Sequence, residues 1–432
     1  MPEPDGPDDE ISRLVQAYAA DRRRRRLTPS FGESVRERML APRSRASGVR
    51  PLATAIVVAA ILAVGGIALA MHVTNVGTDV NRPWQLVSVP GSGSLAGVAC
   101  PSAGNCWAVG QTGSPTADRA ILEHYAEDEW EAVAGPGLGN GWGEGLDGIS
   151  CPAPGDCWAV GSAFPVEDGT TAVQALVEHL VAGHWTAAVA SGLGAMALTG
   201  VACPAPGDCW ATGGGGFENG SAIPVLAHYD GHGWSLAQSL PYSSQAYLMG
   251  VACPSTTVCW AVGETGERAP TGVFVAQGLI ERYAQGAWTT ATTLSGFLRL
   301  NAVACTGTAD CWATGFSVAS SPQVQVVAEH GTTFGWTAAS IPSGVQLGGD
   351  GIACTGGGTC WIAGGTSNQA GTTGYPFVAR LAGGAWTVVS TPPAGENGSQ
   401  LNSVACDPSG TCWAVGYDDN GVTVTPLIDG DA

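Results

Sequence analysis

The chain has no lysine, and arginine supplies all 17 of its basic residues. Only six arginines lie beyond residue 73, where 28 acidic residues give a formal charge of −22. A surface of this sign repels nucleic acid and anionic lipid, so we expect no nucleic-acid partner. An acidic surface suits solubility and leaves cationic or sugar ligands open.

Cysteine is also absent from the first 99 residues. The other part of the chain holds 14 cysteines, in seven pairs with five residues between the partners. The pairs are Cys100/Cys106, Cys151/Cys157, Cys203/Cys209, Cys253/Cys259, Cys305/Cys311, Cys354/Cys360 and Cys406/Cys412. Structural zinc needs four ligands, which an isolated pair does not supply. We therefore predict seven disulfides, no metal and no cofactor, in an oxidising compartment.

A single hydrophobic segment, Leu52–Val73, stands before the first cysteine. Only Thr54 and His72 are polar among its 22 residues. At about 1.5 Å per residue this length crosses a bilayer core of about 30 Å. The alternative is a signal peptide cleaved after Ala70, although the hydrophobic regions of signal peptides are usually shorter. We expect an uncleaved single-pass anchor in the plasma membrane.

The segment before this predicted span, residues 1–50, carries 11 arginines, five of them consecutive at Arg22–Arg26. Cationic flanks stay in the cytoplasm, so the rest of the chain is predicted to be extracytoplasmic. The arm is expected to be partly helical or disordered and to lie on anionic lipid. Because a short helical arm before one span resembles actinobacterial anti-sigma factors, the alternative is a cytoplasmic protein partner.

The cysteine pairs belong to a repeat of 49 to 52 residues, with a Trp after each second cysteine. Each repeat contains four strand-like segments, and a further Trp opens the fourth segment. A repeat of this length and pattern is typical of a propeller blade. If the two cysteines face each other across the first hairpin, Gly97 faces Val109 and Ala99 faces Trp107, which makes room for the next blade. Cross-strand neighbours are close enough for a disulfide within one hairpin.

The two ends of the repeat region are out of phase. Trp84 opens a fourth-type strand before any first strand, whereas the chain ends at Pro426–Ala432 where the last blade still needs its fourth strand. We therefore predict an all-β, seven-bladed β-propeller closed by its N-terminal strand, without open edges. The expected organisation is an arm at 1–50, a membrane helix at 51–73, a linker at 74–82 and the propeller at 83–432.

The turn Asp230–Trp234, with sequence DGHGW, follows a W-A-x-G strand. This combination resembles the Asp-box and kelch-like propeller repeats of secreted actinobacterial proteins. The resemblance implies the propeller fold, and it implies no single activity, because such families include sialidases, galactose oxidase and pure binding proteins.

Several catalytic sites are disfavoured by the residues present. A sialidase clusters arginines, whereas those beyond residue 73 are scattered at Arg82, Arg119, Arg268, Arg282, Arg299 and Arg380. Galactose oxidase needs a free cysteine, and every cysteine is paired by the repeat. The four histidines His124, His179, His228 and His330 recur at one position of the third strand, which indicates a structural role. Glycosidase chemistry by two carboxylates stays open.

Loops between strands two and three, and between blades, vary in length and are the expected binding surface. The loop Glu131–Gly145 holds Trp142, the one Trp outside both repeat positions, followed by Glu144 and Asp147. Further candidates in such loops are Tyr242, Tyr247, Arg268 and Tyr375. We predict a non-enzymatic binding or sensing module for a wall component, glycan, peptide or protein. The alternatives are a carbohydrate-active hydrolase or lyase and an anti-sigma-like signalling protein.

Overall fold

A computed structural model describes residues 84–89, 91–113, 118–166, 173–218, 221–237, 245–268, 274–296, 298–317, 325–342, 346–367, 374–389, 398–420 and 423–430. The predicted arm, membrane helix and linker at 1–82 lie outside these residues. In the part of the chain that is described, no helix has the length and apolar character needed to cross a bilayer.

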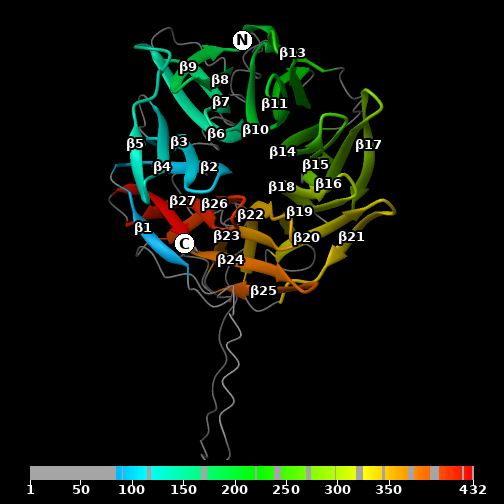
Figure 1. Ribbon diagram of the computed structural model, residues 1–432. Coiled ribbons are helices and arrows are strands. Elements are labelled where there is room, and N and C mark those ends of the chain that lie inside the picture. Colours follow the sequence, from blue (N-terminus) through cyan, green and yellow to red (C-terminus); the bar gives the residue numbers. More distant parts are fainter. Residues whose placement is uncertain are drawn as a thin grey trace, which may run out of the picture.

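The described strands form seven antiparallel sheets of four strands each, arranged as blades around an axis (Figure 1). The first, innermost strands are β2 (Ser94–Ser102), β6 (Trp142–Ala153), β10 (Met196–Ala205), β14 (Gln245–Ser255), β18 (Leu298–Gly307), β22 (Gln346–Cys354) and β26 (Gly398–Cys406). The second strands are β3 (Asn105–Gln111), β7 (Asp156–Pro165), β11 (Asp208–Glu218), β15 (Val258–Arg268), β19 (Asp310–Ser317), β23 (Cys360–Ser367) and β27 (Cys412–Asp419).

The outer half of each blade follows the same order. The third strands are β4 (Ala120–Ala126), β8 (Gln174–Val181), β12 (Ser221–Tyr229), β16 (Phe274–Ala284), β20 (Gln325–Thr332), β24 (Gly374–Ala382) and β28 (Val424–Gly430). The fourth strands are β5 (Glu129–Val133), β9 (His184–Val189), β13 (Trp234–Leu236), β17 (Ala287–Leu294), β21 (Gly335–Ala339), β25 (Ala385–Val389) and β1 (Gln85–Ser88). A short 3₁₀ helix, η1 (Ser191–Leu193), follows β9. Blade 1 begins at β2 and blade 7 at β26.

The ring closes through the N-terminal strand, as predicted. Strand β1 pairs antiparallel with β28, and Leu86 lies opposite Asp429. Blade 7 therefore has the order β1-β28-β27-β26, with strands from both ends of the described chain. Trp84, immediately before β1, is 2% exposed.

The first hairpin has the predicted register, with Gly97 opposite Val109 and Ala99 opposite Trp107. A register shift after Leu95 marks a β-bulge, which the sequence analysis missed. At the bulge, a Cβ on Gly97 would lie 3.2 Å from the Cα of Gly148 in blade 2. A small residue is needed there because the innermost strands of adjacent blades approach closely.

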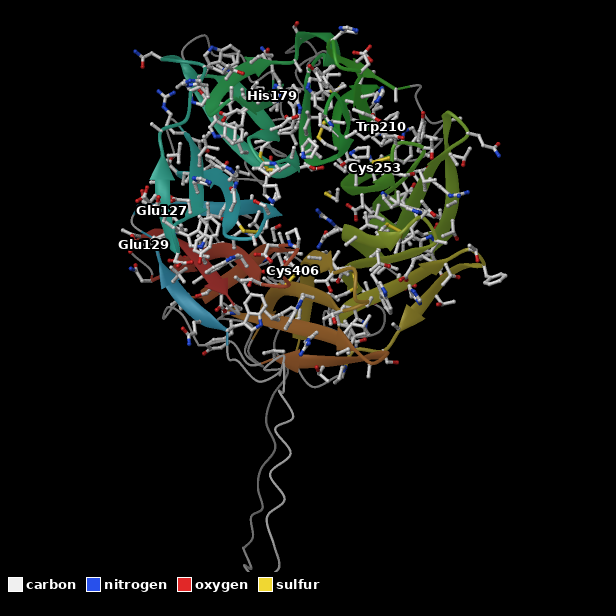
Figure 2. All side chains as sticks on the ribbon, viewed as in Figure 1. Glu127, Glu129, His179, Trp210, Cys253 and Cys406 are labelled. Atoms are coloured by element: carbon white, nitrogen blue, oxygen red, sulfur yellow. A yellow bond between two sulfur atoms is a disulfide. The ribbon has the colours of Figure 1, made fainter. Side chains whose placement is uncertain are left out.

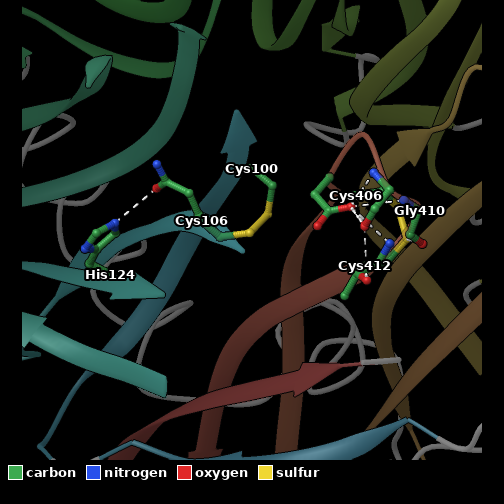
Figure 3. The surroundings of a disulfide bond; sticks show 10 residues. Cys100, Cys106, His124, Cys406, Gly410 and Cys412 are labelled. Atoms are coloured by element: carbon green, nitrogen blue, oxygen red, sulfur yellow. Dashed lines mark hydrogen bonds between the residues drawn. A yellow bond between two sulfur atoms is a disulfide. The ribbon is translucent and has the colours of Figure 1, made fainter. Parts of the chain in front are cut away.

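All seven disulfides lie within their own hairpins, as predicted, with Cα atoms 4.0 to 4.1 Å apart. They join Cys100 to Cys106, Cys151 to Cys157, Cys203 to Cys209, Cys253 to Cys259, Cys305 to Cys311, Cys354 to Cys360 and Cys406 to Cys412. Figure 3 shows the first of these bonds beside the Cys406 hairpin of the neighbouring blade.

The second cysteine of each pair lies in the core, which the sequence analysis did not predict. Six of them are 0% exposed, namely Cys106, Cys157, Cys209, Cys259, Cys360 and Cys412, and Cys311 is 1% exposed. Each packs into the cluster that contains the inner Trp of the preceding blade, as Cys209 does with Trp158 and Cys259 with Trp210. Cys311 belongs in the same way to the cluster of Trp260. These cysteines are therefore structural residues that a ligand at the surface does not reach.

The turns of the first hairpins differ between blades. In blade 1 pairing continues past the cysteines to Ser102 and Asn105, so the turn is shorter than the five residues between the cysteines. In blade 7 pairing ends at Cys406 and Cys412, and the Asp407 Oδ1 atom accepts backbone hydrogen bonds of 2.7 to 3.2 Å within the five-residue turn between them.

The repeated Trp residues form one contact pair between each blade and the next. The Trp after each second cysteine meets, edge to face, the Trp of the fourth strand in the next blade. The seven pairs are Trp107/Trp185, Trp158/Trp234, Trp210/Trp288, Trp260/Trp336, Trp312/Trp386, Trp361/Trp84 and Trp413/Trp130. Their ring centroids are 5.2 to 5.6 Å apart. This geometry favours aromatic pairs and links the blades.

The other face of most inner Trp rings is covered by the recurring third-strand residue. His179 stacks on Trp158 at 3.8 Å between centroids, and its Nε2 atom lies 2.9 Å from Asp156 Oδ1. The same arrangement occurs with His228 and His330, and His124 stacks on Trp107 with its Nε2 atom 3.0 Å from Asn105 Oδ1. Arg282 and Arg380 take this position over Trp260 and Trp361. In Figure 2, His179 and Trp210 lie within the blades, whereas Glu127 and Glu129 lie on the outer rim.

Candidate functional site

Strand direction divides the propeller into two faces. The turns between strands one and two, and between strands three and four, lie on one side, which we call the hairpin face. The connections between strands two and three, and from strand four to the next blade, lie on the opposite side, the variable-loop face. Both ends of the described chain, at Trp84 and Gly430, come to the hairpin face.

The loop before blade 2 is held by a buried carboxylate on the variable-loop face. Glu144 is 1% exposed, and its Oε1 atom accepts a hydrogen bond of 2.7 Å from the Leu138 backbone N–H. Arg119, from the loop before β4, lies 3.6 Å from the same oxygen and donates to the Gly139 carbonyl at 3.1 Å. Its second contact, to the Trp142 carbonyl, is 3.4 Å. These contacts fix the loop over residues 134–141.

The predicted position of Trp142 in that loop was wrong. Trp142 is the first residue of β6 and pairs with Pro165, because strands β6 and β7 extend beyond the repeat. Its half-buried side chain packs against the cluster of Leu146 and Leu176. The structure thus brings Trp142 and Glu144 together, with Arg119 as an additional residue that the sequence analysis did not select.

The other candidate residues are spread over several blades. Asp147 is half-buried on β6. Tyr247 is half-buried on β14, next to Gly214. Tyr375 lies on β24, opposite Thr366, and is 40% exposed. Arg268 is the last residue of β15, and neither its side chain nor Tyr242 belongs to the described part. The predicted loop positions of Tyr247, Arg268 and Tyr375 were wrong, because the strands run further into the variable-loop face.

A polar network that was not predicted from the sequence joins the innermost strands of blades 5 to 7. Arg299 on β18 donates from Nε to Asn301 Oδ1 at 3.0 Å. Asn301 Nδ2 donates across to blade 6, to the Gly349 carbonyl at 2.9 Å and Asp350 Oδ1 at 3.2 Å. Gln400 from blade 7 donates to Asp350 Oδ2 at 2.6 Å. We call these four side chains, Arg299, Asn301, Asp350 and Gln400, the inner network.

Burial makes the Asp350 carboxyl group of this network harder to ionise. It raises the pKa of Asp350 to about 7, against the lowering effects of the Gln400 hydrogen bond and the Arg299 charge. The network lies near the start of the first strands, at the variable-loop end. The sequence gives little indication of this network, because the equivalent strand position differs between blades. It is Arg299 in blade 5, Gly348 in blade 6 and Gln400 in blade 7.

Buried carboxylates also recur on the third strands. Glu123, Glu178, Glu281, Glu329 and Asp429 are all 6% exposed or less. Burial raises the pKa of Glu123 and Asp429 to about 7. It raises the pKa of Glu178 to about 8, with a further contribution from the charge of Glu144. Among the described residues neither Glu178 oxygen has a hydrogen-bond partner, so its neutral form is favoured near neutral pH.

Two cavities lie between blades near the rim. One, of about 330 Å³, is lined by Trp158, His179, Thr186 and Trp234. The other, of about 600 Å³, occupies the matching place between blades 5 and 6 and is lined by Trp312 and Trp386. None of the described residues selected from the sequence as binding candidates lines either cavity. Within the described ranges, no three His, Cys, Asp or Glu side chains are grouped to hold a metal ion.

These features define the chain as a seven-bladed β-propeller stapled by hairpin disulfides. No family model matches the sequence, and no curated protein is similar to it in sequence. Solved structures have similar folds at low identity. A GH74 xyloglucanase from Xanthomonas campestris is 12% identical with a TM-score of 0.51, and the match covers 80% of this chain and 55% of the xyloglucanase.

Two further solved structures superpose less well on this chain. YCF48 bound to a D1 peptide is 13% identical with a TM-score of 0.34, over 80% of this chain and 84% of YCF48. The β-propeller domain of the Trilobed protease from Pyrococcus furiosus is 8% identical with a TM-score of 0.46, over 78% of this chain and 96% of that domain. The neighbours thus include hydrolases and a peptide-binding protein, and at these identities they show the fold alone.

Proposed function

We propose that the protein is a membrane-anchored, extracytoplasmic binding or sensing module that takes a wall component, glycan, peptide or protein on its variable-loop face. The hydrophobic segment Leu52–Val73 and the arginine-rich arm support the anchor, and seven disulfides support an oxidising location. We also propose that the protein comes from an actinobacterium and that its repeats are related to Asp-box or kelch-like propeller repeats.

The ordered loop of blade 2 is the observation that carries the binding role. Glu144 and Arg119 contact the backbone of Leu138 and Gly139 in the loop over residues 134–141, beside the partly exposed Trp142. A loop that is already ordered loses little entropy on binding, and aromatic side chains are common anchors of binding surfaces. The buried Glu144 acts as support for the loop, because its Oε1 atom is engaged by Leu138.

A binding screen on the full-length protein tests this proposal. Glycans, wall fragments and peptides are offered to the wild type and to Trp142→Ala. The matched control is Phe334→Ala, which removes a 99% exposed aromatic ring from the hairpin face. We expect weaker retention for Trp142→Ala alone. Equal retention by all three proteins would contradict binding at this loop.

The competing function is a carbohydrate-active hydrolase or lyase. Its test is turnover of wall polysaccharides, followed by substitution of single carboxylates on the variable-loop face. Turnover that one such substitution abolishes would replace the binding proposal. A signalling role of residues 1–50 predicts recovery of a cytoplasmic protein by that arm, whereas recovery of lipid alone would contradict it.

A further inference from the structure

The turns of the hairpin face differ in charge between two groups of blades. In blades 4 to 6 the turns lie at 254–258, 284–287, 306–310, 332–335, 355–359 and 382–385. They contain one acidic residue, Asp310, whose Oδ1 atom lies 2.8 Å from His330 Nε2. The described turns of the other blades carry seven acidic residues, which are Glu127, Asp128, Glu129, Asp156, Asp208, Asp230 and Asp407. The hairpin ends of blades 4 to 6 are therefore poor in negative charge.

The same three blades carry two arginines without a carboxylate partner. Arg282 in blade 4 and Arg380 in blade 6 lie two residues before the turn between the third and fourth strands. Each lies over a Trp ring, and among the described residues neither guanidinium has a hydrogen-bond or ion-pair partner. Blades with His over this Trp have Asp or Asn before the second cysteine, whereas blade 4 has Val258 and blade 6 has Thr359. Both guanidinium groups thus keep donors for an external anion.

Blade 5, between these two arginines, presents an exposed aromatic ring. Phe334 is 99% exposed and lies in the turn that joins β20 to β21. Its backbone N–H donates to Thr332 Oγ1 at 3.2 Å, which gives the turn a defined contact. The equivalent position in five other blades is polar or glycine, namely Asp128, Gly183, His232, Gly286 and Gly384. Phe334 is therefore no part of the repeat, and its ring gains free energy by entering an apolar phase.

The N-terminal strand enters the propeller next to these blades. Trp84 lies at the hairpin face and contacts Trp361 of blade 6. Ten residues, 74–83, separate Trp84 from the hydrophobic segment Leu52–Val73. Ten residues span at most about 35 Å when fully extended. If that segment crosses a membrane, the hairpin face stays within about 35 Å of the bilayer surface.

We propose that the hairpin ends of blades 4 to 6 rest on a phospholipid surface, with Phe334 inserted among the lipids and Arg282 and Arg380 bound to lipid phosphates. This inference rests on the membrane anchor of the proposed function and adds which face of the propeller meets the membrane. A guanidinium matches phosphate oxygens in geometry and charge, and an aromatic ring is a common interfacial anchor. Anionic lipid repels the acidic turns of the other blades, so the propeller tilts toward blades 4 to 6. The variable-loop face then points away from the membrane.

Photo-cross-linking of the full-length protein measures this contact. The protein is reconstituted into vesicles of phosphatidylglycerol and phosphatidylcholine, with p-benzoylphenylalanine at position 334. The matched control carries the same group at position 232, the equivalent turn position of blade 3, where the turn also contains Asp230. Mass spectrometry should detect lipid adducts about tenfold more often at position 334 than at position 232, given the two nearby arginines.

Substitutions of the charged groups change the yield of lipid adducts at position 334. Arg282→His combined with Arg380→His places the residue of four other blades at both positions and should lower the yield about fivefold or more. Gln285→Glu introduces the acid that blade 1 has at the equivalent Glu127 and should also lower it, because anionic lipid repels the new charge. Added salt should have the same effect by screening. Glu129→Gln in blade 1 is the control and should leave the yield unchanged.

The outcomes separate this inference from the anchor. Equal adducts at positions 334 and 232, or none at 334, in a chain that stays in the bilayer would overturn the proposed orientation and leave the anchor standing. Adducts of position 334 with a partner protein or a second copy of the chain, in place of lipid, would overturn it too. Release of the chain from the vesicles by carbonate would overturn the anchor and this inference together. If the double His variant is unstable, the comparison of positions 334 and 232 still decides.

Discussion

Trp84 and Trp361 meet edge to face, with ring centroids 5.3 Å apart and an angle of 72° between the planes. Trp84 precedes the first described strand, whereas Trp361 follows the second cysteine of blade 6. Six equivalent pairs surround the axis, so the N-terminal Trp occupies the place that a fourth-strand Trp of blade 7 would take. The closure of the ring is therefore a side-chain contact as well as a strand pairing.

Trp84→Ala should destabilise the propeller by about 3 to 5 kcal/mol, the usual loss for a buried Trp. The residue is 2% exposed and packs with Leu401 and Leu427 as well as Trp361. Denaturant unfolding of the full-length protein measures the difference. Leu86→Ala is the control on the same strand, since Leu86 is 46% exposed. Equal effects of the two substitutions would show that Trp84 is not part of the core.

The buried carboxylates predict a stability that falls as the pH rises. Burial raises the pKa of Glu178 to about 8 and of Glu123 and Asp429 to about 7. The unfolded pKa of glutamate is about 4.3, below these folded-state values. The stabilisation from the neutral carboxyl groups is therefore fully present below about pH 4.3 and is lost as the pH rises through 7 to 8. The melting temperature should be higher at pH 5 than at pH 9.

Glu178→Gln isolates one of these groups. The amide cannot ionise, so the variant should be more stable than the wild type at pH 9, and the difference should shrink or reverse at pH 5. Glu129→Gln, at an exposed position on the rim, is the matched control and should leave the pH dependence unchanged. A pH profile of Glu178→Gln that superimposes on that of the wild type would contradict the assignment of a buried, neutral Glu178.

Each hairpin disulfide should contribute about 2 kcal/mol, as expected for a ring of about seven residues. Replacing both Cys151 and Cys157 by alanine removes the bond between them. Alanine also leaves no free thiol. The loss in unfolding free energy should disappear when wild type and variant are compared under reducing conditions. A loss that persists after reduction would assign the effect to packing of Cys157, which is fully buried.

The pairs of third-strand His and second-strand Asp predict that two substitutions of Asp156 lower the stability by different amounts. Asp156 Oδ1 lies 2.9 Å from His179 Nε2, and blade 1 has Asn105 in the corresponding place beside His124. Asp156→Asn should therefore be close to neutral, whereas Asp156→Ala should cost about 1 kcal/mol. Thermal unfolding of the two variants checks this order. The reverse order, or equal losses, would show that the pair does not orient the imidazole over Trp158.

The fold was predictable because every blade repeats the same cysteine and Trp positions. A register guessed for one hairpin, with Gly97 opposite Val109, holds in the structure because the disulfide and the alternation of side chains fix it. The closure was predictable because Trp84 is out of phase with the repeat. The bulge after Leu95 was missed, since nothing in a single repeat distinguishes an unpaired residue from a paired one.

The candidate site was predicted less well. Trp142 was selected as an exception to the repeat, and it lies beside Glu144 as expected, but on a strand. Arg119 and Arg299 were treated only as members of a set of arginines scattered along the sequence. Positions in the sequence do not reveal contacts between blades. Arg299 reaches Met249, and Asn301 reaches Asp350, over separations of 50 and 49 residues, about one full repeat. Such contacts depend on the ring, so they follow only after the blades are assembled.

Deletion of residues 84–90, with the rest of the chain intact, tests most directly whether the propeller is closed by its N-terminal strand. The account predicts a sharp fall in melting temperature and rapid proteolysis of blade 7, because β28 loses its partner strand and Trp361 loses Trp84. A melting temperature equal to that of the intact protein would contradict the closed ring.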